Sequence, residues 1–305
     1  MSETDRRCPL AVVAGYLGAG KTTFLRRYAR RIAPRRVAFL VNEFAASDVD
    51  TPLFLGDGLD AVGISGGSIF CRCKITDFLR VLPELPARFP AAAGVVVEAS
   101  GLADPSAAQT VLDEAGLHRL YRFVGTLTLV DPGTLPKVLD TLPAAERQVT
   151  AADAVVISKA DLHDARRIEA TAELVRSLNP RAQLFTAAHG ECALDLLAMR
   201  DPQWVEGAVN ACADAPAQAV DLPCPGVIDA DALAAALAAF AADLLRAKGF
   251  FCTPAGWRYL DWSAGRLMLQ PSAAGPAGIA VIVHPRAADA MQALAARLAR
   301  GDFAA

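Results

Sequence analysis

Residues 15–22, GYLGAGKT, restrict the fold of this chain more than any other stretch. They fit the pattern G-x-x-x-x-G-K-[ST] and lie between an apolar, strand-like run, LAVVAG, and a helix-like run, KTTFLRRYARRIA. In that context the glycines let the loop wrap tightly, so that successive main-chain N–H groups and a helix N-terminus face an anionic ligand. The sequence therefore predicts a phosphate-binding strand–loop–helix unit.

Apolar runs alternate with helix-like runs through the first two hundred residues. Several of the apolar runs are almost continuously hydrophobic, which is typical of strands covered by helices on both sheet faces. The further strand candidates are RRVAFLVNEF, AGVVVEAS, FVGTLTLVDP, ADAVVISKAD and AQLFTAAHG, and DARRIEATAELVRSLN is a helix candidate. This alternation predicts an α/β fold, a doubly wound, mostly parallel P-loop NTPase sheet.

The composition changes near ACADAPAQAVDLPCPG, which is rich in Ala and Pro and has little periodicity. We therefore expect a nucleotide-binding domain over residues 1–210 and a smaller α+β domain over residues 220–305. The expected elements of the second domain are a long helix over about residues 229–248, a hairpin in WRYLDWSAGRLMLQ turning at residues 263–265, a strand in GIAVIVHP, and a closing helix from Arg286.

Composition and charge exclude some classes of partner. The net charge of −3 gives no electrostatic reason to expect nucleic acid or an anionic membrane. The first residues lack a signal-peptide h-region, and no stretch reaches the uninterrupted apolar length of a membrane span. Seven cysteines, an odd number, argue against a disulfide framework. We expect a cytoplasmic protein with reduced thiols.

The loop residues have predicted roles in binding a nucleoside triphosphate. Lys21 would reach the β- and γ-phosphates, the Thr22 hydroxyl would complete the Mg²⁺ shell, and Thr23 would meet the α-phosphate. The main chain of the loop would supply the remaining contacts, from Gly15, Gly18, Ala19 and Gly20. In VVVEASGLADP, Glu98 can hold Mg²⁺ through water or orient the attacking water, and the Gly101 N–H can report on the γ-phosphate.

A purine-reading loop is expected at the end of a later strand. VVISKADL contains Ser158, Lys159, Ala160 and Asp161, a variant of the Asn-Lys-x-Asp guanine motif with Ser in place of Asn. The Asp161 carboxylate can accept from both N1–H and the 2-amino group of guanine, whereas adenine offers neither donor. Lys159 would lie along the base, and Ala187 belongs to a second loop on the base side. A surface lysine and a helix N-cap aspartate are the structural alternative.

Two cysteines follow a glycine-rich stretch in GISGGSIFCRCKITDF, and an acidic loop, NEFAASDVD, follows the second strand. The acidic loop suits a switch segment that senses Mg²⁺ and γ-phosphate. Cys71 and Cys73 could bind a metal, with Glu43 or Asp48 as further ligands, since structural zinc takes four ligands and open sites three. The alternative is that the cysteine pair only packs against apolar neighbours.

Taken together, these motifs resemble the CobW family of GTPases, relatives of the nickel-insertion GTPases HypB and UreG. The matching pieces are GYLGAGKTTFL, VNEF, VVVEASGLADP, ISKADL and LLRAKGFF. The resemblance implies a GTPase that acts as a metal chaperone, with a CobW-type C-terminal domain. The family usually has Cys-x-Cys-Cys after its glycines; this chain has Ser68 and Phe70 at the first two cysteine positions, keeps Cys71, and adds Cys73.

Three functional hypotheses follow. The first is a GTPase that uses GTP and Mg²⁺ to deliver a metal or metal-containing cofactor to a client protein, with Zn²⁺ or Co²⁺ as the metal. Under this hypothesis the protein could act as a homodimer. The second is a GTP-gated regulator or reactivator of a corrinoid enzyme or metalloenzyme that binds no free metal. The third is a small-molecule kinase, against which the guanine-type motif counts.

Overall fold

The computed structural model describes residues 5–43, 49–65, 67–70, 75–199, 202, 217–263 and 265–305. The chain forms two compact units. The first comprises Met1–Asn42, Phe54–Ile64 and Ser68–Cys212; the second comprises Glu43–Leu53, Ser65–Gly67 and Ala213–Ala305.

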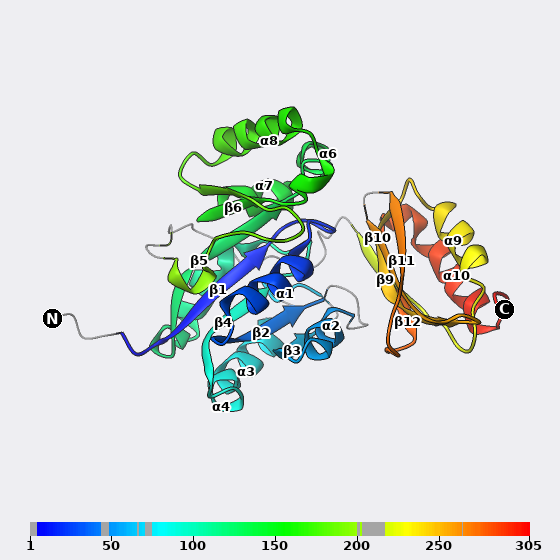
Figure 1. The fold of residues 1–305 in the computed structure, drawn as a ribbon, viewed down its shortest axis with the longest axis horizontal. Coiled ribbons are helices and arrows are strands. Elements are labelled where there is room, and N and C mark those ends of the chain that lie inside the picture. The colour runs from blue at the N-terminus through cyan, green and yellow to red at the C-terminus, as the bar shows by residue number, and fades with distance from the viewer. Residues whose placement is uncertain are drawn as a thin grey trace. The chain divides into compact units, whose positions relative to one another are not determined.

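The first unit is built on a seven-stranded sheet in the order β3-β2-β4-β1-β5-β6-β7, and all its neighbouring strands are parallel (Figure 1). Its strands are β1 Cys8–Ala14, β2 Arg36–Asn42, β3 Asp60–Ile64, β4 Ala92–Glu98, β5 Tyr121–Val130, β6 Ala154–Ile157 and β7 Gln183–Thr186. The expected doubly wound parallel sheet is therefore confirmed. Parallel strands end at the same edge, so the loops after β1, β4 and β6 lie at that edge.

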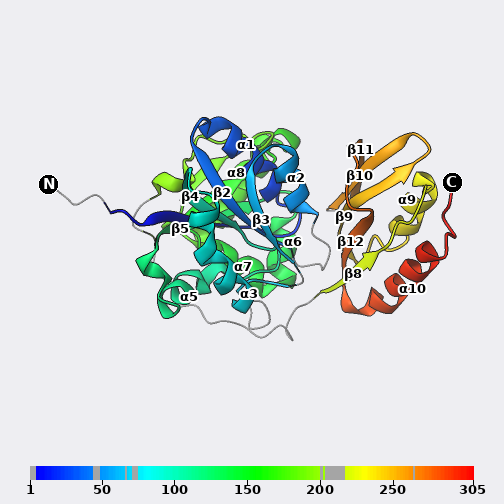
Figure 2. The same cartoon turned by 90° about the horizontal axis from the view of Figure 1, so that it is seen from below.

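Helices cover both faces of this sheet (Figure 2). Ala11 and Val13 of β1 pack in one core with α1 Lys21–Ile32, whereas Leu10 and Val12 face a second core with α3 Ile75–Val81 and α5 Ala108–Glu114. This explains why the strands read as continuous apolar runs. The remaining helices are α2 Asp50–Gly56, α4 Leu85–Arg88, α6 Leu135–Thr141, α7 Pro143–Thr150 and α8 Ala165–Leu178, with short 3₁₀ turns at Leu82–Glu84, Pro105–Ala107, Leu117–Arg119, Ala160–Leu162 and Leu196–Ala198.

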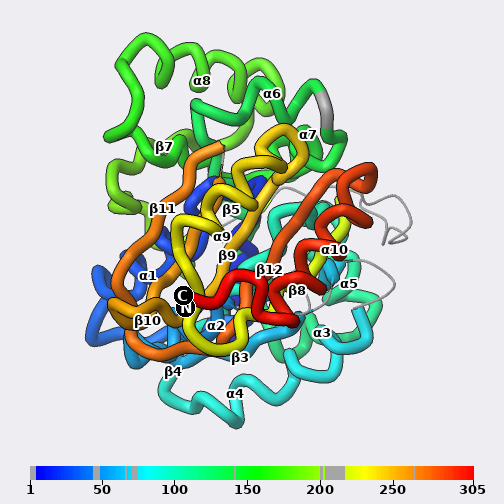
Figure 3. Tube along the Cα trace, turned by 90° about the vertical axis from the view of Figure 1, so that its right-hand side faces the viewer, coloured from blue at the N-terminus to red at the C-terminus, as the bar shows by residue number. Residues whose placement is uncertain are grey.

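The second unit has an antiparallel five-stranded sheet in the order β11-β10-β9-β12-β8. Two helices, α9 and α10, pack with one face of it in a single apolar core (Figures 1 and 3). The smaller α+β domain is thus confirmed as a fold class. Its elements are β8 Gln218–Leu222, α9 Ala230–Ala238, β9 Leu244–Thr253, β10 Gly256–Ser263, β11 Arg266–Pro271, β12 Gly278–Val283, a 3₁₀ turn Pro285–Ala287 and α10 Ala288–Ala299.

The expected long helix over residues 229–248 is wrong in its second half. Asp229 caps α9 by accepting hydrogen bonds from the N–H groups of Asp231 and Ala232, at 2.9 and 3.1 Å, but the helix ends at Ala238. The chain then enters β9, which pairs with β10 on one side and β12 on the other. Pairing with two strands that come later in the sequence outweighs the helix propensity of the alanine-rich run.

Residues just after β2 contribute to the second unit. The buried Lys248 ammonium of β9 donates to the buried Asp50 carboxylate, and Val49 packs with Phe250 and Ala280. Asp50 also begins α2, and its N–H donates to the Glu43 carboxylate at 3.1 Å.

Among the described residues, no helix is both long and apolar enough to cross a lipid bilayer.

Candidate functional site

The phosphate loop, residues 15–22, joins the end of β1 to the start of α1, as its motif predicts. Gly15 approaches β5 so closely that an added Cβ would lie 2.5 Å from the Leu129 carbonyl oxygen, which excludes any side chain there. Gly20 precedes the helix in a left-handed conformation with φ of 93°. The Lys21 ammonium is buried and donates to the Gly15 carbonyl at 2.7 Å, so it folds back over the loop.

Glu98, Thr22 and Ser100 gather beside this loop. Glu98 ends β4 and pairs with Val13 of β1, the strand that leads into the loop. The Thr22 hydroxyl donates to the Glu98 carboxylate at 3.1 Å. The buried Ser100 hydroxyl has no hydrogen-bond partner among the described residues. Carboxylate and hydroxyl oxygens are ligands that Mg²⁺ prefers. A buried hydroxyl such as that of Ser100 normally has a hydrogen-bond partner, which a bound ligand or its water could supply. These residues therefore fit a magnesium site.

Gly101 lies against the phosphate loop. A Cβ added to it would lie 2.4 Å from the Leu17 Cδ2 and 2.8 Å from the Leu17 main-chain nitrogen. The loop after β4, residues 99–104, which we call the β4 loop, is therefore in van der Waals contact with the phosphate loop. Only glycine fits at this position without moving the backbone of Leu17.

The base loop, residues 158–161, follows β6 and is tied to the phosphate loop. The buried Ser158 hydroxyl donates to the Ala19 carbonyl at 2.7 Å and lies 3.1 Å from the Val130 carbonyl. Serine in place of asparagine therefore still fastens this loop to the phosphate loop. Lys159 has a left-handed backbone, with φ of 54°, which turns its side chain sharply after the strand.

The Asp161 carboxylate accepts a hydrogen bond from the His189 N–H at 2.7 Å, and the His189 imidazole Nδ1 lies 3.1 Å from its other oxygen. The N–H of His189 lowers the pKa of Asp161, which keeps it ionised and able to accept hydrogen bonds. Ala187 is buried and lies after β7. Its carbonyl accepts from the Ala160 N–H at 3.0 Å, and its N–H donates to the Ile157 carbonyl at 2.8 Å. Its main-chain groups thus hold the two base-side loops together.

Sequence reasoning missed Asp131, which anchors the base loop. Asp131 directly follows β5, and its carboxylate accepts from the Lys159 ammonium at 2.8 Å and lies 3.0 Å from the His163 Nε2. Burial raises the pKa of Asp131, but the Lys159 charge and hydrogen bonds from Lys159, Gly133 and His163 outweigh it, so the pKa is below its usual value. A polar residue at the end of an apolar strand, the signal that identified Glu98, could have found it.

Asn42 and Gln148 were also missed. Both are buried side-chain amides that hydrogen-bond to the β4 loop. Asn42 stands in the quoted VNEF motif at the end of β2, so its position after a strand was a usable signal. Gln148 lies within α7, and no local pattern distinguishes it from a helix-surface glutamine.

The predicted metal ligands are only partly within the described residues. Cys71, Cys73 and Asp48 lie outside them. Glu43 lies directly after β2, where its carboxylate accepts the Asp50 N–H. Within the part of the chain that the structure describes, there is no cluster of three or more His, Cys, Asp or Glu side chains that could hold a metal ion.

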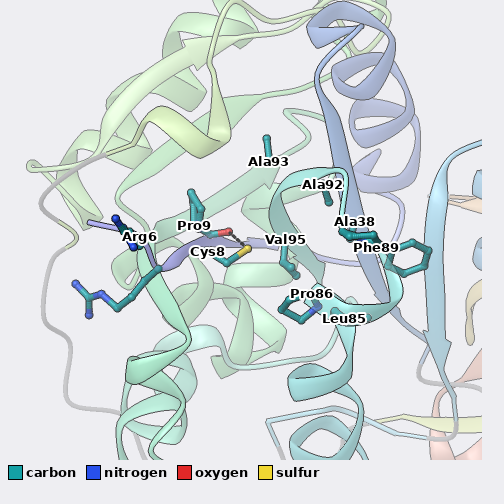
Figure 4. A pocket seen from close by; sticks show the side chains of 12 residues that line it. Arg6, Cys8, Pro9, Ala38, Leu85, Pro86, Phe89, Ala92, Ala93 and Val95 are labelled. Atoms are coloured by element: carbon teal, nitrogen blue, oxygen red, sulfur yellow. Dashed lines mark hydrogen bonds between the residues drawn. The ribbon is translucent and has the colours of Figure 1, made fainter. Parts of the chain in front are cut away.

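A separate cavity of about 270 Å³ lies where β1 and β4 begin (Figure 4). Its lining includes Arg6, Cys8, Phe89 and Val95. Burial raises the pKa of the Cys8 thiol, so the thiol stays protonated at neutral pH. Ligands of open parallel sheets bind at the opposite, carboxyl ends of the strands, where the phosphate loop lies.

Comparison with known proteins agrees with this geometry. Residues 9–186 match the family model described as the CobW/HypB/UreG nucleotide-binding domain. Zinc chaperone YjiA of Escherichia coli (strain K12) is 30% identical over 198 residues, which cover 62% of this chain and 61% of YjiA. Zinc chaperone CobW of Sinorhizobium sp. is 27% identical over 220 residues, 63% of this chain and 62% of that protein.

Zinc-regulated GTPase metalloprotein activator 1 of Saccharomyces cerevisiae (strain ATCC 204508 / S288c) is 24% identical over 218 residues, which cover 63% of this chain and 51% of the yeast protein. The matches thus span about half to three fifths of these relatives' lengths. A zinc-bound triple mutant of the YjiA GTPase has a similar fold, with a TM-score of 0.50 and 21% identity over 96% of this chain and 99% of that one. Because the family model matches more than half of the sequence, this chain belongs to the CobW/HypB/UreG family of nucleotide-binding proteins.

Proposed function

We propose that this protein binds and hydrolyses GTP, and that its nucleotide state controls delivery of a metal ion or metal-containing cofactor to a client protein. The observation that carries the proposal is the contact of Thr22 with Glu98 beside the Lys21 ammonium and the β4 loop. These are the groups that a triphosphate and its cation need, at the carboxyl edge of a parallel sheet.

Phosphate binding would use groups that already point toward the loop. The Lys21 ammonium would exchange its bond to the Gly15 carbonyl for the β- and γ-phosphate oxygens. The exposed Thr23 at the start of α1 would meet the α-phosphate, next to main-chain N–H groups. Magnesium held by Thr22, and by Glu98 through water, would neutralise charge on the phosphates. Glu98 would orient water toward the γ-phosphorus, and the Gly101 N–H would bond a γ-phosphate oxygen.

Guanine selectivity would come from Asp161. Its carboxylate is ionised and its side chain is 18% exposed, so it can accept from N1–H and the 2-amino group of guanine. Lys159, held by Asp131, would lie along the purine face. Ser158 supports this role indirectly, because it ties the base loop to the phosphate loop and sets the distance between base and phosphates.

The metal-handling part of the proposal rests on the relatives, which carry the names zinc chaperone and zinc-regulated GTPase metalloprotein activator. We propose Cys71 and Cys73 as thiolate ligands for Zn²⁺ or Co²⁺, with Glu43 as a further ligand or a second subunit supplying one. The metal here is the cargo. We propose that its binding depends on nucleotide, because Glu43 directly follows β2, whose carboxyl end lies at the sheet edge of the phosphate loop, and because Cys71 and Cys73 come after β3 in the sequence.

A second candidate is a GTP-gated regulator of a metalloenzyme that binds no free metal. Phe70 favours it, since this side chain stands at a position where the family usually has a cysteine. It is buried in the core and packs edge-on against Phe78, with ring centroids 5.9 Å apart.

The nucleotide part is tested by titrating GTP, GDP and ATP in the presence of Mg²⁺ and by measuring phosphate release. We expect GTP to bind more tightly than ATP, and Lys21→Ala to lower turnover at least about 100-fold, as expected for a group that neutralises transition-state charge. Lys137→Ala, in the exposed surface of α6, is the matched control. Equal affinities for ATP and GTP would contradict the role of Asp161.

The metal part is tested by titrating Zn²⁺ and Co²⁺ against the wild type and the Cys71→Ser/Cys73→Ser variant, with GTP or GDP bound. Tighter binding by the wild type supports metal delivery. Equal affinities, together with intact GTP binding and no metal after mild purification, favour the regulator.

A further inference from the structure

Two buried side-chain amides bracket one peptide bond of the β4 loop. Asn42, at the end of β2, accepts the Ser100 N–H with its Oδ1 at 3.2 Å. Gln148, in α7, donates from its Nε2 to the Gly101 carbonyl at 3.2 Å and to the Ala103 carbonyl at 2.8 Å. The exposed fractions of the two residues are 4% and 1%. The peptide that joins Ser100 to Gly101 therefore has a side-chain anchor on each side.

These anchors determine where the Gly101 N–H points. The Ser100 carbonyl accepts from the Ala103 N–H at 3.0 Å, so it is turned into the β4 loop. Because a trans peptide is planar, the Gly101 N–H must point in the opposite direction. Contact of Gly101 with Leu17 keeps this N–H beside the phosphate loop.

The same side chains are fastened to the body of the first unit. The Asn42 amide nitrogen donates to the Ile64 carbonyl at 3.1 Å, and its oxygen also accepts the Ile69 N–H at 3.1 Å. The Gln148 main-chain carbonyl accepts the Thr128 hydroxyl at 2.6 Å. Asn42, through its amide, and Gln148, through its main-chain carbonyl, are thus bonded to strands of the sheet. A buried amide that lost its bonds to the β4 loop would be left unsatisfied.

We propose that Asn42 and Gln148 are positioning residues for recognition of the γ-phosphate. They hold the Ser100–Gly101 peptide so that its N–H already points toward the γ-phosphate position before nucleotide binds. Binding then does not have to include the free-energy cost of orienting this N–H. This inference rests on the proposed function, which gives Gly101 the contact with the γ-phosphate. It adds the residues that orient that contact, one from β2 and one from α7.

The test compares affinity for GDP with affinity for a slowly hydrolysed GTP analogue, GTPγS, at constant Mg²⁺. In Gln148→Met and Asn42→Leu, we expect the preference for GTPγS over GDP to fall at least about tenfold, which corresponds to about 1.4 kcal/mol. The affinity for GDP should change less than about threefold, since GDP lacks the phosphate that the N–H would contact. Asn42→Asp retains an acceptor for the Ser100 N–H and should restore part of the preference.

Asn179→Leu is the matched control. Asn179 is also a buried amide, and it donates to the carbonyls of Val149, Thr150 and Ala152 at 2.9, 3.2 and 2.8 Å, away from the β4 loop. The Asn179→Leu variant should be less stable than the wild type but should keep the wild-type preference for GTPγS over GDP. If Gln148→Met does not fold, Gln148→Leu, which also removes both amide hydrogens and adds no charge beside the two carbonyls, takes its place.

An unchanged preference in folded Asn42 and Gln148 variants would overturn the inference, and so would an equal loss of GDP and GTPγS affinity, which indicates a merely structural role. Failure of the proposed function looks different. In that case the wild type itself would bind guanine nucleotides no better than ATP, or Lys21→Ala would bind and hydrolyse GTP normally.

Discussion

Asp131 shows how one side chain can organise a nucleotide loop without belonging to its motif. Its carboxylate is 5% exposed and contacts Lys159, the lysine of the base loop, and His163, which comes just after that loop. The Gly133 N–H donates to it at 2.7 Å. The carboxylate therefore fixes the Lys159 side chain and compensates its charge at the same time.

We expect Asp131→Asn to lower the free energy of unfolding by about 1–3 kcal/mol at pH 7, because the charged hydrogen bonds to Lys159 are lost. The folded pKa of Asp131 is depressed, so its contribution to stability is complete above the unfolded pKa, about 3.9, and is lost as the pH falls through the folded value. The difference between wild type and variant should therefore shrink below about pH 4. Urea unfolding followed by circular dichroism at pH 7 and at lower pH measures it.

The control is Asp140→Asn, since Asp140 is an exposed carboxylate in α6 of the same unit. Its replacement should change stability by less than about 0.5 kcal/mol. A wild-type minus Asp131→Asn difference that stays constant between neutral and acid pH would show that the Asp131 charge contributes nothing to stability.

Among the elements, β9 departs most from what its local sequence favours. The alanine-rich run before it is a good helix former, yet β9 lies in the middle of its sheet and pairs with β10 and β12. Gly249 pairs with Leu260 on one side and Ile279 on the other. A Cβ at Gly249 would lie 2.1 Å from the Gly278 carbonyl oxygen and 2.5 Å from the Ile279 Cα, so this strand needs glycine for close approach of the backbones.

Gly249→Ala should therefore destabilise the second unit by about 1–3 kcal/mol or more, because β9 and β12 must move apart. Trp257 and Trp262 in β10 provide a fluorescence signal for this unit, and guanidinium unfolding would measure the change. Cys252→Ala in the same strand only truncates a half-buried side chain and serves as control, with an expected loss below about 1.5 kcal/mol. Equal losses in the two variants would argue against the steric explanation.

In the molecule as a whole, each of the two units is built from segments that are not contiguous in the sequence. Glu43–Leu53 and Ser65–Gly67, which flank strands of the first unit, belong to the second. Within the second unit, Asp50 and Lys248 form a buried ion pair between residues 198 positions apart. The acidic loop NEFAASDVD, which the sequence suggests as a nucleotide switch, therefore ends at Asp50, whose ion-pair partner Lys248 lies in the C-terminal part of the chain.

Lys248→Met should lower stability by about 3–5 kcal/mol, because it leaves the Asp50 carboxylate buried without its cation. The double variant Asp50→Leu/Lys248→Met should recover much of this loss, since well-packed apolar residues often replace a buried ion pair at little cost. Thermal unfolding of the two variants and the wild type measures both effects. A single variant as stable as the wild type would mean that the pair is not formed in solution.

Much of the fold and part of the site could be predicted because they depend on neighbouring residues. A continuous apolar run between turn residues indicates a buried strand, and a contiguous glycine-rich loop carries its own phosphate-binding chemistry. This is why β1, β4, β5 and β6, the phosphate loop and the base loop were found. The end of β4 was found in the same way, since Glu98 directly follows an apolar run.

Local patterns along the chain were enough to predict the parallel sheet, the position of the phosphate loop and the residue types at that loop. Three features came from the folded structure alone: Asn42 and Gln148 bond on either side of the Ser100–Gly101 peptide, Asp131 holds Lys159, and β9 is a strand. These contacts join residues far apart in the chain, and they form because packing of the sheets leaves buried polar groups that must find partners. Local helix and strand propensities do not include the need of a buried polar group for a partner. In the first half of β9, local propensity favoured a helix where the structure has a strand.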